Sequence, residues 1–269
     1  MTEPESEPES GSAEGKKSRR SRGIYLLPNL FTTAGLFAGF FAIISSVEAQ
    51  FANAAIAIFI AMIMDGLDGR VARMTHTESD FGAEYDSMAD MVSFGLAPAL
   101  LIHQWALTSY GKIGWLAAFV FTAGAALRLA RFNTQVGIAD KRYFQGLASP
   151  AAAALIAGLV WLGVDLGWEG ADKKVIAALV SFSAGVLMVS NVRYHSFKQF
   201  DLRGKVPFIV LVAVMLVFAV IYLHPPVVLF SIFFIYAVSG PVMTLRQLQR
   251  HRSEKNKPAA DKPDTTPGE

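Results

Sequence analysis

Long apolar runs alternate along this chain with short stretches of charged, polar and glycine residues. Eight of these runs, each about 17 to 25 residues long, have the length that a helix needs to cross a bilayer. They cover approximately residues 26–47, 51–73, 83–108, 113–132, 148–166, 175–191, 206–223 and 227–245. The pattern predicts an all-α fold, a polytopic membrane helix bundle with about eight transmembrane helices.

Composition agrees with a membrane protein. Apolar residues make up 53% of the 269 residues, and the mean hydropathy is +0.39. The sequence has no cysteine, which excludes a disulfide framework, a zinc–thiolate site and a cysteine nucleophile. Pro98 lies inside the third apolar run, where we expect it to kink or break the helix.

Both ends of the chain are polar. The N-terminal stretch begins acidic and rich in Pro, Ser and Gly, then changes to the basic run KKSRRSR. We expect residues 1–22 to form a disordered tail whose basic part lies against anionic lipid. Residues 247–269 are charged, contain proline and are expected to be disordered as well. Residues 23–246 then form one membrane domain.

Lysine and arginine are distributed unevenly among the polar segments. With eight spans, the side that holds the N-terminus carries all of the 24 Lys and Arg residues except Lys112, Lys173 and Lys174. Cytoplasmic loops of membrane proteins carry such an excess. We therefore expect both termini, and the acidic stretch described next, at the cytoplasmic face of the cell (inner) membrane.

Four aspartates lie in the stretch DGLDGRVARMTHTESDFGAEYDSMAD, residues 65–90. Asp65 and Asp68 are three apart and Asp86 and Asp90 four apart, so each pair shares one face of a helix. Two facing helices would bring all four carboxylates together, where they need cations, and hard oxygen ligands suit Mg²⁺ or Mn²⁺. We expect Asp86 and Asp90 at a helix N-terminus, whose dipole stabilises anions, and the other pair toward a C-terminus.

Glycines and an arginine are interleaved with these acids. Gly66, Gly69 and Gly82 would let a phosphate or nucleotide approach the backbone, and Arg73 offers a planar fork for phosphate oxygens. An alternative is an acidic loop with glycines for helix packing, and another is an acid-lined ion or proton transporter. A transporter explains neither the interleaved residues nor the location of both acidic pairs at one face instead of the midplane.

Read as D-x2-D-G-x2-A-R-x8-G-x3-D-x3-D, this stretch resembles the signature of the CDP-alcohol phosphatidyltransferases at every fixed position. The fixed positions are Asp65, Asp68, Gly69, Ala72, Arg73, Gly82, Asp86 and Asp90. The resemblance implies an integral membrane enzyme that moves a phosphatidyl group from CDP-diacylglycerol to an alcohol and releases CMP. It further implies a homodimer in the lipid bilayer, and no nucleic acid is expected as a partner.

The resemblance also implies roles for the acids. Two ions, Mg²⁺ or Mn²⁺, would clamp the diphosphate, with Asp65 and Asp86 as ligands to both. Asp68 would complete one metal site and Asp90 the other. Asp90 is in addition similar to the family's catalytic base, which takes the proton of the alcohol.

Further residues resemble those that bind CDP-diacylglycerol. Those beside the acids are Gly69, Arg73, Gly82 and Ser79. In the run PNLFT, residues 28–32, Asn29 and Thr32 are placed to cap a first helical turn. The family has an Asn-x-x-Thr here that contacts the nucleotide lipid, so the resemblance favours a substrate role for both.

The acceptor alcohol has to be inferred from segments downstream. ALRLARFN (126–133), YFQGLASPAAA (143–153) and LMVSNVRYHSFK (187–198) resemble the serine-accepting branch of the family. L-serine carries a carboxylate, so its site should offer a cation that does not serve the diphosphate. Arg128 and Arg131 are placed to form a bidentate clamp, although one of them can be a positive-inside anchor instead. The alternative is a sister enzyme that uses glycerol 3-phosphate, inositol phosphate or another alcohol.

Overall fold

The computed structural model describes residues 14–75, 77, 79–135, 143–195 and 208–255, and this part of the chain is almost entirely helical. In the described residues, each of the eight predicted apolar segments is mostly helix, which confirms the all-α prediction. The helices are α1 (Glu14–Val47), α2 (Phe51–Thr75), α3 (Asp80–Asp90), η1 (Met91–Leu96), α4 (Ala97–Ile102), η2 (His103–Leu107), η3 (Thr108–Tyr110), α5 (Gly111–Gln135), α6 (Ser149–Asp165), η4 (Gly170–Lys173), α7 (Lys174–Val189), α8 (Phe208–Leu223) and α9 (Pro225–Lys255).

Four segments of the described chain are long and apolar enough to cross a membrane. They are Leu27–Val47, Phe51–Thr75, Asp80–Thr134 and Pro225–Arg246. This number is smaller than the expected eight for two reasons. The third segment is a hairpin that contains two predicted spans, and α6, α7 and α8 have only 17, 16 and 16 residues, slightly short of a full crossing.

The third predicted span is not a regular α-helix. Two π-helical stretches, η1 and η2, flank the short helix α4. Pro98 lies in the first turn of α4, where its missing N–H interrupts the hydrogen-bond ladder that would otherwise continue from η1. The N–H of Ala97 bonds five residues back to Val92 O, so a widened turn accommodates the proline. The hairpin then reverses at Gly111, which has a φ of 57°.

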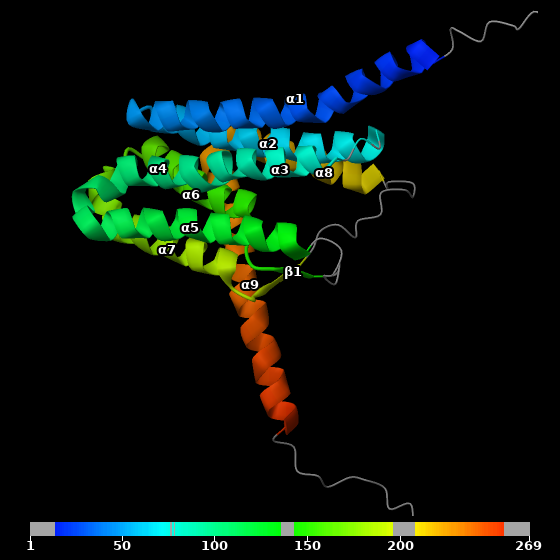
Figure 1. Ribbon diagram of the computed structural model, residues 1–269. Helices are drawn as coiled ribbons and strands as arrows, with labels where there is room; N and C mark the ends of the chain where they lie inside the picture. Colours follow the sequence, from blue (N-terminus) through cyan, green and yellow to red (C-terminus); the bar gives the residue numbers. More distant parts are fainter. Residues whose placement is uncertain (1–13, 76, 78, 136–142, 196–207, 256–269) are drawn as a thin grey trace, which may run out of the picture.

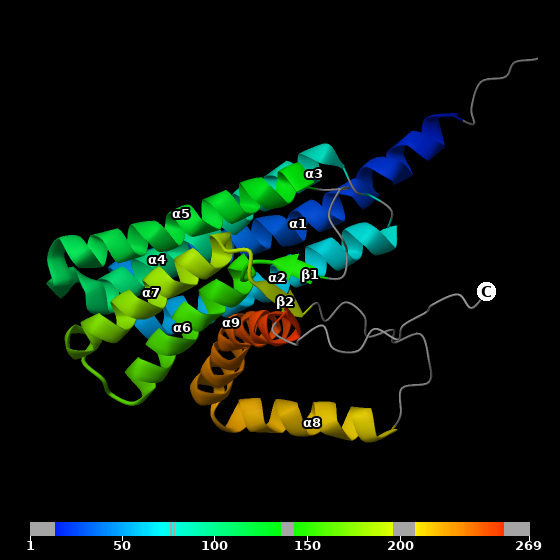
Figure 2. The ribbon, with the colours of Figure 1, turned by 90° about the horizontal axis from the view of Figure 1, so that it is seen from below.

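Most helices lie side by side and run along a common direction (Figure 1). α1 packs against α2 and α3, α5 against α7, and α6 against both α2 and α9. α9 crosses the others steeply, and its C-terminal half stands away from the bundle in Figure 1 and is seen end-on in Figure 2.

Glycines allow the closest of these helix contacts. A Cβ on Gly39 of α1 would lie 2.7 Å from the Cα of Ser93 in η1, and one on Gly124 of α5 would lie 2.5 Å from the carbonyl oxygen of Gly185 in α7. Since real Cβ atoms do not approach so closely, α1 and η1 can cross here only because residue 39 has no side chain. This crossing therefore sets the position of α1, along its own axis, relative to α2 and α3.

The two terminal helices extend further than the expected domain boundaries. α1 begins at Glu14 and includes the basic run, and α9 continues to Lys255. Lys, Arg, Gln and Glu are good helix formers, so both helices continue into sequence that we expected to be tail. The rest of the two expected tails, residues 1–13 and 256–269, lies outside the described residues.

Two short strands were not expected from the sequence. β1 (Tyr143–Gln145) and β2 (Arg193–His195) pair antiparallel, with Phe144 opposite Tyr194. They are too short for an alternating pattern to be recognised in the sequence. The ribbon leads directly into α6, which begins four residues after Gln145.

Candidate active site

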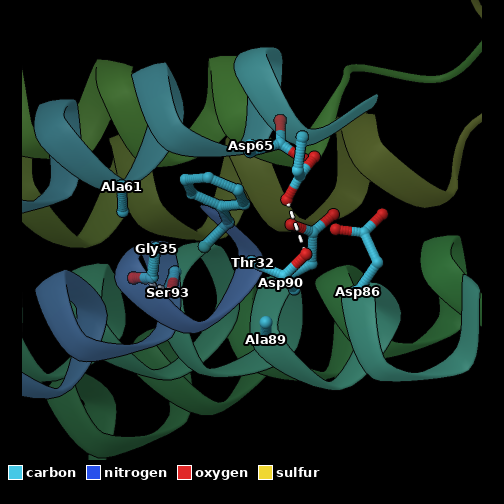
Figure 3. A pocket seen from close by; sticks show the side chains of 10 residues that line it. Thr32, Gly35, Ala61, Asp65, Asp86, Ala89, Asp90 and Ser93 are labelled. Atoms are coloured by element: carbon cyan, nitrogen blue, oxygen red, sulfur yellow. Dashed lines mark hydrogen bonds between the residues drawn. The ribbon is translucent and has the colours of Figure 1, made fainter. Parts of the chain in front are cut away.

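The four aspartates of the sequence motif line one small pocket between α1, α2 and α3 (Figure 3). Asp65 and Asp68 come from α2, and Asp86 and Asp90 from α3. The residues reach the pocket because each pair occupies one helix face, as the spacing predicted. α1 closes the pocket with Thr32 and Gly35, and Ser93 of η1 donates a hydrogen bond to the Gly35 carbonyl at 3.1 Å.

Three of the carboxylates are close enough to share a cation. One oxygen from each of Asp65, Asp68 and Asp86 lies within 4.8 Å of the other two. Asp90 lines the same pocket and contacts Asp65. Carboxylate oxygens are the ligands that Mg²⁺ and Mn²⁺ prefer, and charges this close repel one another unless a cation separates them. The residues present therefore fit a divalent metal.

The expected placement of the acids relative to helix ends is wrong. α3 begins at Asp80, so Asp86 lies in its second turn and Asp90 is its last residue. α2 continues to Thr75, well past Asp65 and Asp68. Because the helix dipole acts within the first and last turns, it does not distinguish the two pairs as we expected.

Thr32 supports the acidic cluster directly. Its hydroxyl donates to Asp68 Oδ2 at 2.9 Å, and both side chains are 5% exposed. Asn29, one turn earlier, lies beside Gly82, where a Cβ would be 3.6 Å from Asn29 Oδ1. Neither residue caps a helix, because α1 begins fifteen residues before Asn29. The capping interpretation is therefore wrong, and both residues face the acid-bearing helices.

Ser79 and Arg73 lie at the outer edge of the site. Ser79 is the N-cap of α3, and its Oγ accepts a hydrogen bond from the Gly82 N–H at 3.1 Å. Arg73 is exposed, and its Nη2 would lie 3.9 Å from a Cβ on Gly69. No other described residue would meet such a Cβ within 4 Å. The backbone at Gly69 is thus open on the side where Arg73 lies.

The two arginines proposed for the acceptor have different surroundings. Arg128 interacts electrostatically with Asp65 and Asp90, and its Nη1 donates to Ser149 Oγ at 2.7 Å. Arg131 instead donates to Asn191 Oδ1 at 3.3 Å. Arg128 is therefore within electrostatic range of the acidic site, whereas Arg131 bonds to a residue just after the end of α7.

Sequence reasoning missed two residues next to Arg128. Ser149 is fully buried in the first turn of α6, and Tyr236 of α9 interacts electrostatically with the Arg128 guanidinium. Both are far from Arg128 in sequence, and neither belongs to a motif with fixed spacing. The only local signal was the segment YFQGLASPAAA, which contains Ser149.

Comparison with protein-family models matches residues 25–192 to the CDP-alcohol phosphatidyltransferases, and the chain belongs to this family. Three relatives are described as CDP-diacylglycerol–serine O-phosphatidyltransferases. One from Helicobacter pylori is 37% identical over 238 residues, which are 88% of this chain and 98% of the relative. One from Methanocaldococcus jannaschii is 35% identical over 204 residues, 76% of this chain and 90% of the relative. One from Mycobacterium leprae is 37% identical over 156 residues, 56% of this chain and 52% of the relative.

Family membership distinguishes between the interpretations of the acidic stretch. The match covers all four aspartates, Gly69, Arg73 and Gly82, so the acids belong to a transferase and not to a transporter or a structural loop.

Proposed function

We propose that this protein transfers the phosphatidyl group of CDP-diacylglycerol to the hydroxyl of L-serine, forming phosphatidylserine and CMP in phospholipid biosynthesis. The observation that carries the proposal is Arg128, a cation of α5 that interacts electrostatically with Asp65 and Asp90 and donates a hydrogen bond to Ser149. Serine needs such a group for its carboxylate. The names of the relatives that cover most of the chain support the same acceptor.

The acids would hold the metal. We propose that Asp65, Asp68, Asp86 and Asp90 bind two divalent ions, Mg²⁺ or Mn²⁺. When bound, these ions would supply Lewis-acid stabilisation of the charge on the diphosphate. The bond from Thr32 fixes the Asp68 carboxylate in one orientation.

The remaining residues of the site bind substrates and move a proton. The open backbone at Gly69 and the Arg73 guanidinium receive the diphosphate or nucleotide, and Asn29, Thr32, Ser79 and Gly82 line its approach. The serine hydroxyl oxygen attacks the phosphorus that carries the diacylglycerol, and CMP leaves. An Asp90 oxygen takes the proton of the serine hydroxyl during this attack. A carboxylate is a weak base for an alcohol, so this transfer accompanies attack and depends on the positioning of serine by Arg128.

The setting in the cell follows from the charge distribution. We propose that the protein spans the inner membrane with eight helices, that both termini are cytoplasmic and that the pocket opens at the cytoplasmic face. Serine and CMP then exchange with cytoplasmic water while the acyl chains stay in the bilayer. We also propose a homodimer, which light scattering of the purified protein in detergent would test.

An acceptor panel tests the proposed reaction. Purified protein with Mg²⁺ or Mn²⁺ should release CMP from CDP-diacylglycerol when L-serine is added, and excess chelator should abolish the release. Asp90→Asn should lower the rate by about 10²- to 10⁴-fold, the contribution typical of a general base. CMP release with glycerol 3-phosphate or inositol phosphate, but not with serine, would contradict the acceptor and leave the reaction type intact.

A further inference from the structure

The residues that join β1 to α6 are bonded to the end of α7 and to the residue before β2. The N–H of Gly146 donates to Val192 O at 2.9 Å, and the N–H of Leu147 donates to Leu187 O at 3.0 Å. Gly146 has a φ of 80°, and a Cβ there would collide with the carbonyl oxygen of Met188. These contacts hold the start of α6 and the ribbon against the end of α7.

One side chain of the ribbon joins it to α9. Tyr194 is fully buried, and its hydroxyl donates to Ala237 O of α9 at 3.0 Å. Its ring occupies the space that a side chain on Gly240 would need, and it packs against Tyr236 with ring centroids 5.3 Å apart. Burial raises the pKa of Tyr194 to about 12, so the hydroxyl stays protonated and remains a donor at neutral pH. Tyr194 thus fixes the turn of α9 that carries Tyr236.

The ribbon reaches Arg128 by two routes. Along the chain, β1 leads into Ser149, whose Oγ accepts from Arg128 Nη1. Across the fold, Tyr194 holds Tyr236, which interacts electrostatically with the same guanidinium. The Arg128 Nε is buried, and no described residue accepts its hydrogen. Ser149 thus holds one end of the guanidinium, whereas the buried Nε–H has a hydrogen-bonding capacity that the described residues do not use.

We propose that the ribbon positions the acceptor site: Tyr194 holds Tyr236 against Arg128, so that the guanidinium presents its Nε–H to the carboxylate of the incoming acceptor. This inference rests on the proposed use of serine and deepens it. Tyr194 and Tyr236 are positioning residues, since they act through Arg128 and not on the reacting atoms.

The family match covers only part of this arrangement. The residues matched to the family end at 192, before Tyr194 and Tyr236. The carboxylates and the residues proposed for CDP-diacylglycerol all lie within the match. Arg128 and Ser149 lie within the match as well, so of the residues in this arrangement only Tyr194 and Tyr236 lie beyond it.

Two single-atom changes test the proposal. Tyr194→Phe removes the bond to Ala237 O and keeps the ring over Gly240, and Tyr236→Phe removes the hydroxyl next to Arg128. Each should raise the KM for L-serine by about threefold to tenfold, the effect of one hydrogen bond, and leave the KM for CDP-diacylglycerol unchanged. In an Arg128→Lys background, Tyr236→Phe should add little, because the residue acts through the arginine.

Tyr222→Phe is the matched control. Tyr222 lies on α8 and is 85% exposed, so its hydroxyl should be dispensable for both substrates. Should Tyr194→Phe fail to fold, Tyr236→Phe carries the same test. Equal changes in the two KM values, or full additivity with Arg128→Lys, would overturn the proposal. If the wild-type enzyme does not use serine, the proposed acceptor is wrong. The two KM values would then be compared with the alcohol that the enzyme does use.

Discussion

Asp65 and Asp86 make the clearest test of the acidic cluster, because each belongs to the group of three carboxylates that approach within 4.8 Å. Replacing either by Asn keeps the shape and removes one charged ligand. We expect Asp65→Asn to abolish turnover and to weaken metal affinity by about 10- to 100-fold or more. A loss of that size is typical even for substitutions of residues that only hydrogen-bond to a metal ligand. Thermal unfolding of the protein in detergent, with and without Mg²⁺, measures that affinity through the metal-dependent rise in Tm.

The control for this experiment is Asp172→Asn, a change of the same kind at an exposed position in η4. It should alter neither turnover nor the response to Mg²⁺. An Asp65→Asn protein with a normal metal response would show that the cluster does not bind the ion.

Arg128→Lys tests the acceptor cation. Lysine keeps the charge but cannot reproduce the fork that bonds Ser149 and leaves Nε–H for a ligand. We expect the KM for L-serine to rise about tenfold or more, the effect of a charge-assisted hydrogen bond, with little change for CDP-diacylglycerol. Arg131→Lys should have a much smaller effect, because Arg131 bonds to Asn191 away from the acids. Equal effects of the two changes would argue against a special role for Arg128.

At the scale of single residues, the sequence predicted what short-range spacing encodes. The pairs Asp65 with Asp68 and Asp86 with Asp90 occur three and four residues apart, and helical geometry alone brings each pair to one face. Ser149 and Tyr236 could not be found in this way. Their contact with Arg128 depends on how α6 and α9 pack against α5, which no local pattern specifies.

At the scale of elements, the crossing of α1 and η1 sets the geometry of the pocket. Gly39→Ala would push a methyl group into Ser93, and helix α1 would have to move away from η1. We expect a destabilisation of about 1–3 kcal/mol, the usual cost of overpacking, together with reduced activity because Thr32 is displaced from Asp68. Thermal unfolding and CMP release measure the two effects.

Gly66→Ala is the matched control for stability. It lies in the interior of α2, and no described atom would be within 4 Å of the added Cβ. There the change should stabilise the helix by about 0.5–1 kcal/mol. Destabilisation of equal size at both positions would refute the packing argument at Gly39.

The apolar runs located the long helices of the described residues but not the irregular turns within them. The sequence indicated only that Pro98 would disturb its helix, and the response of the backbone, the π-helical η1 that starts directly after Asp90, depends on packing. Helix ends were also less predictable. Charged residues of high helix propensity extend α1 and α9 beyond their apolar segments, because apolar content and helix propensity are different properties.

At the scale of the whole molecule, the turns that follow α1, η3 and α6 lie at the end opposite the ribbon (Figures 1 and 2). The chain has no cysteine, so single cysteines can report the orientation. Glu48→Cys, Lys112→Cys and Asp172→Cys should react with an impermeant thiol reagent added outside intact cells, whereas Ser18→Cys and Ser253→Cys should react only after lysis. The reverse pattern would invert the proposed topology.

In the proposed function, one group of helices binds the metal ions and the diphosphate, and a second group binds the acceptor alcohol. The carboxylates and Thr32 come from α1, α2 and α3, while Arg128, Ser149 and Tyr236 come from α5, α6 and α9. If Arg128 binds the acceptor as we propose, mutations in the second group would alter which alcohol is bound without displacing the acids. Under the same proposal, a change of headgroup product would require substitutions around Arg128 only, while the chemistry on the nucleotide lipid stays the same.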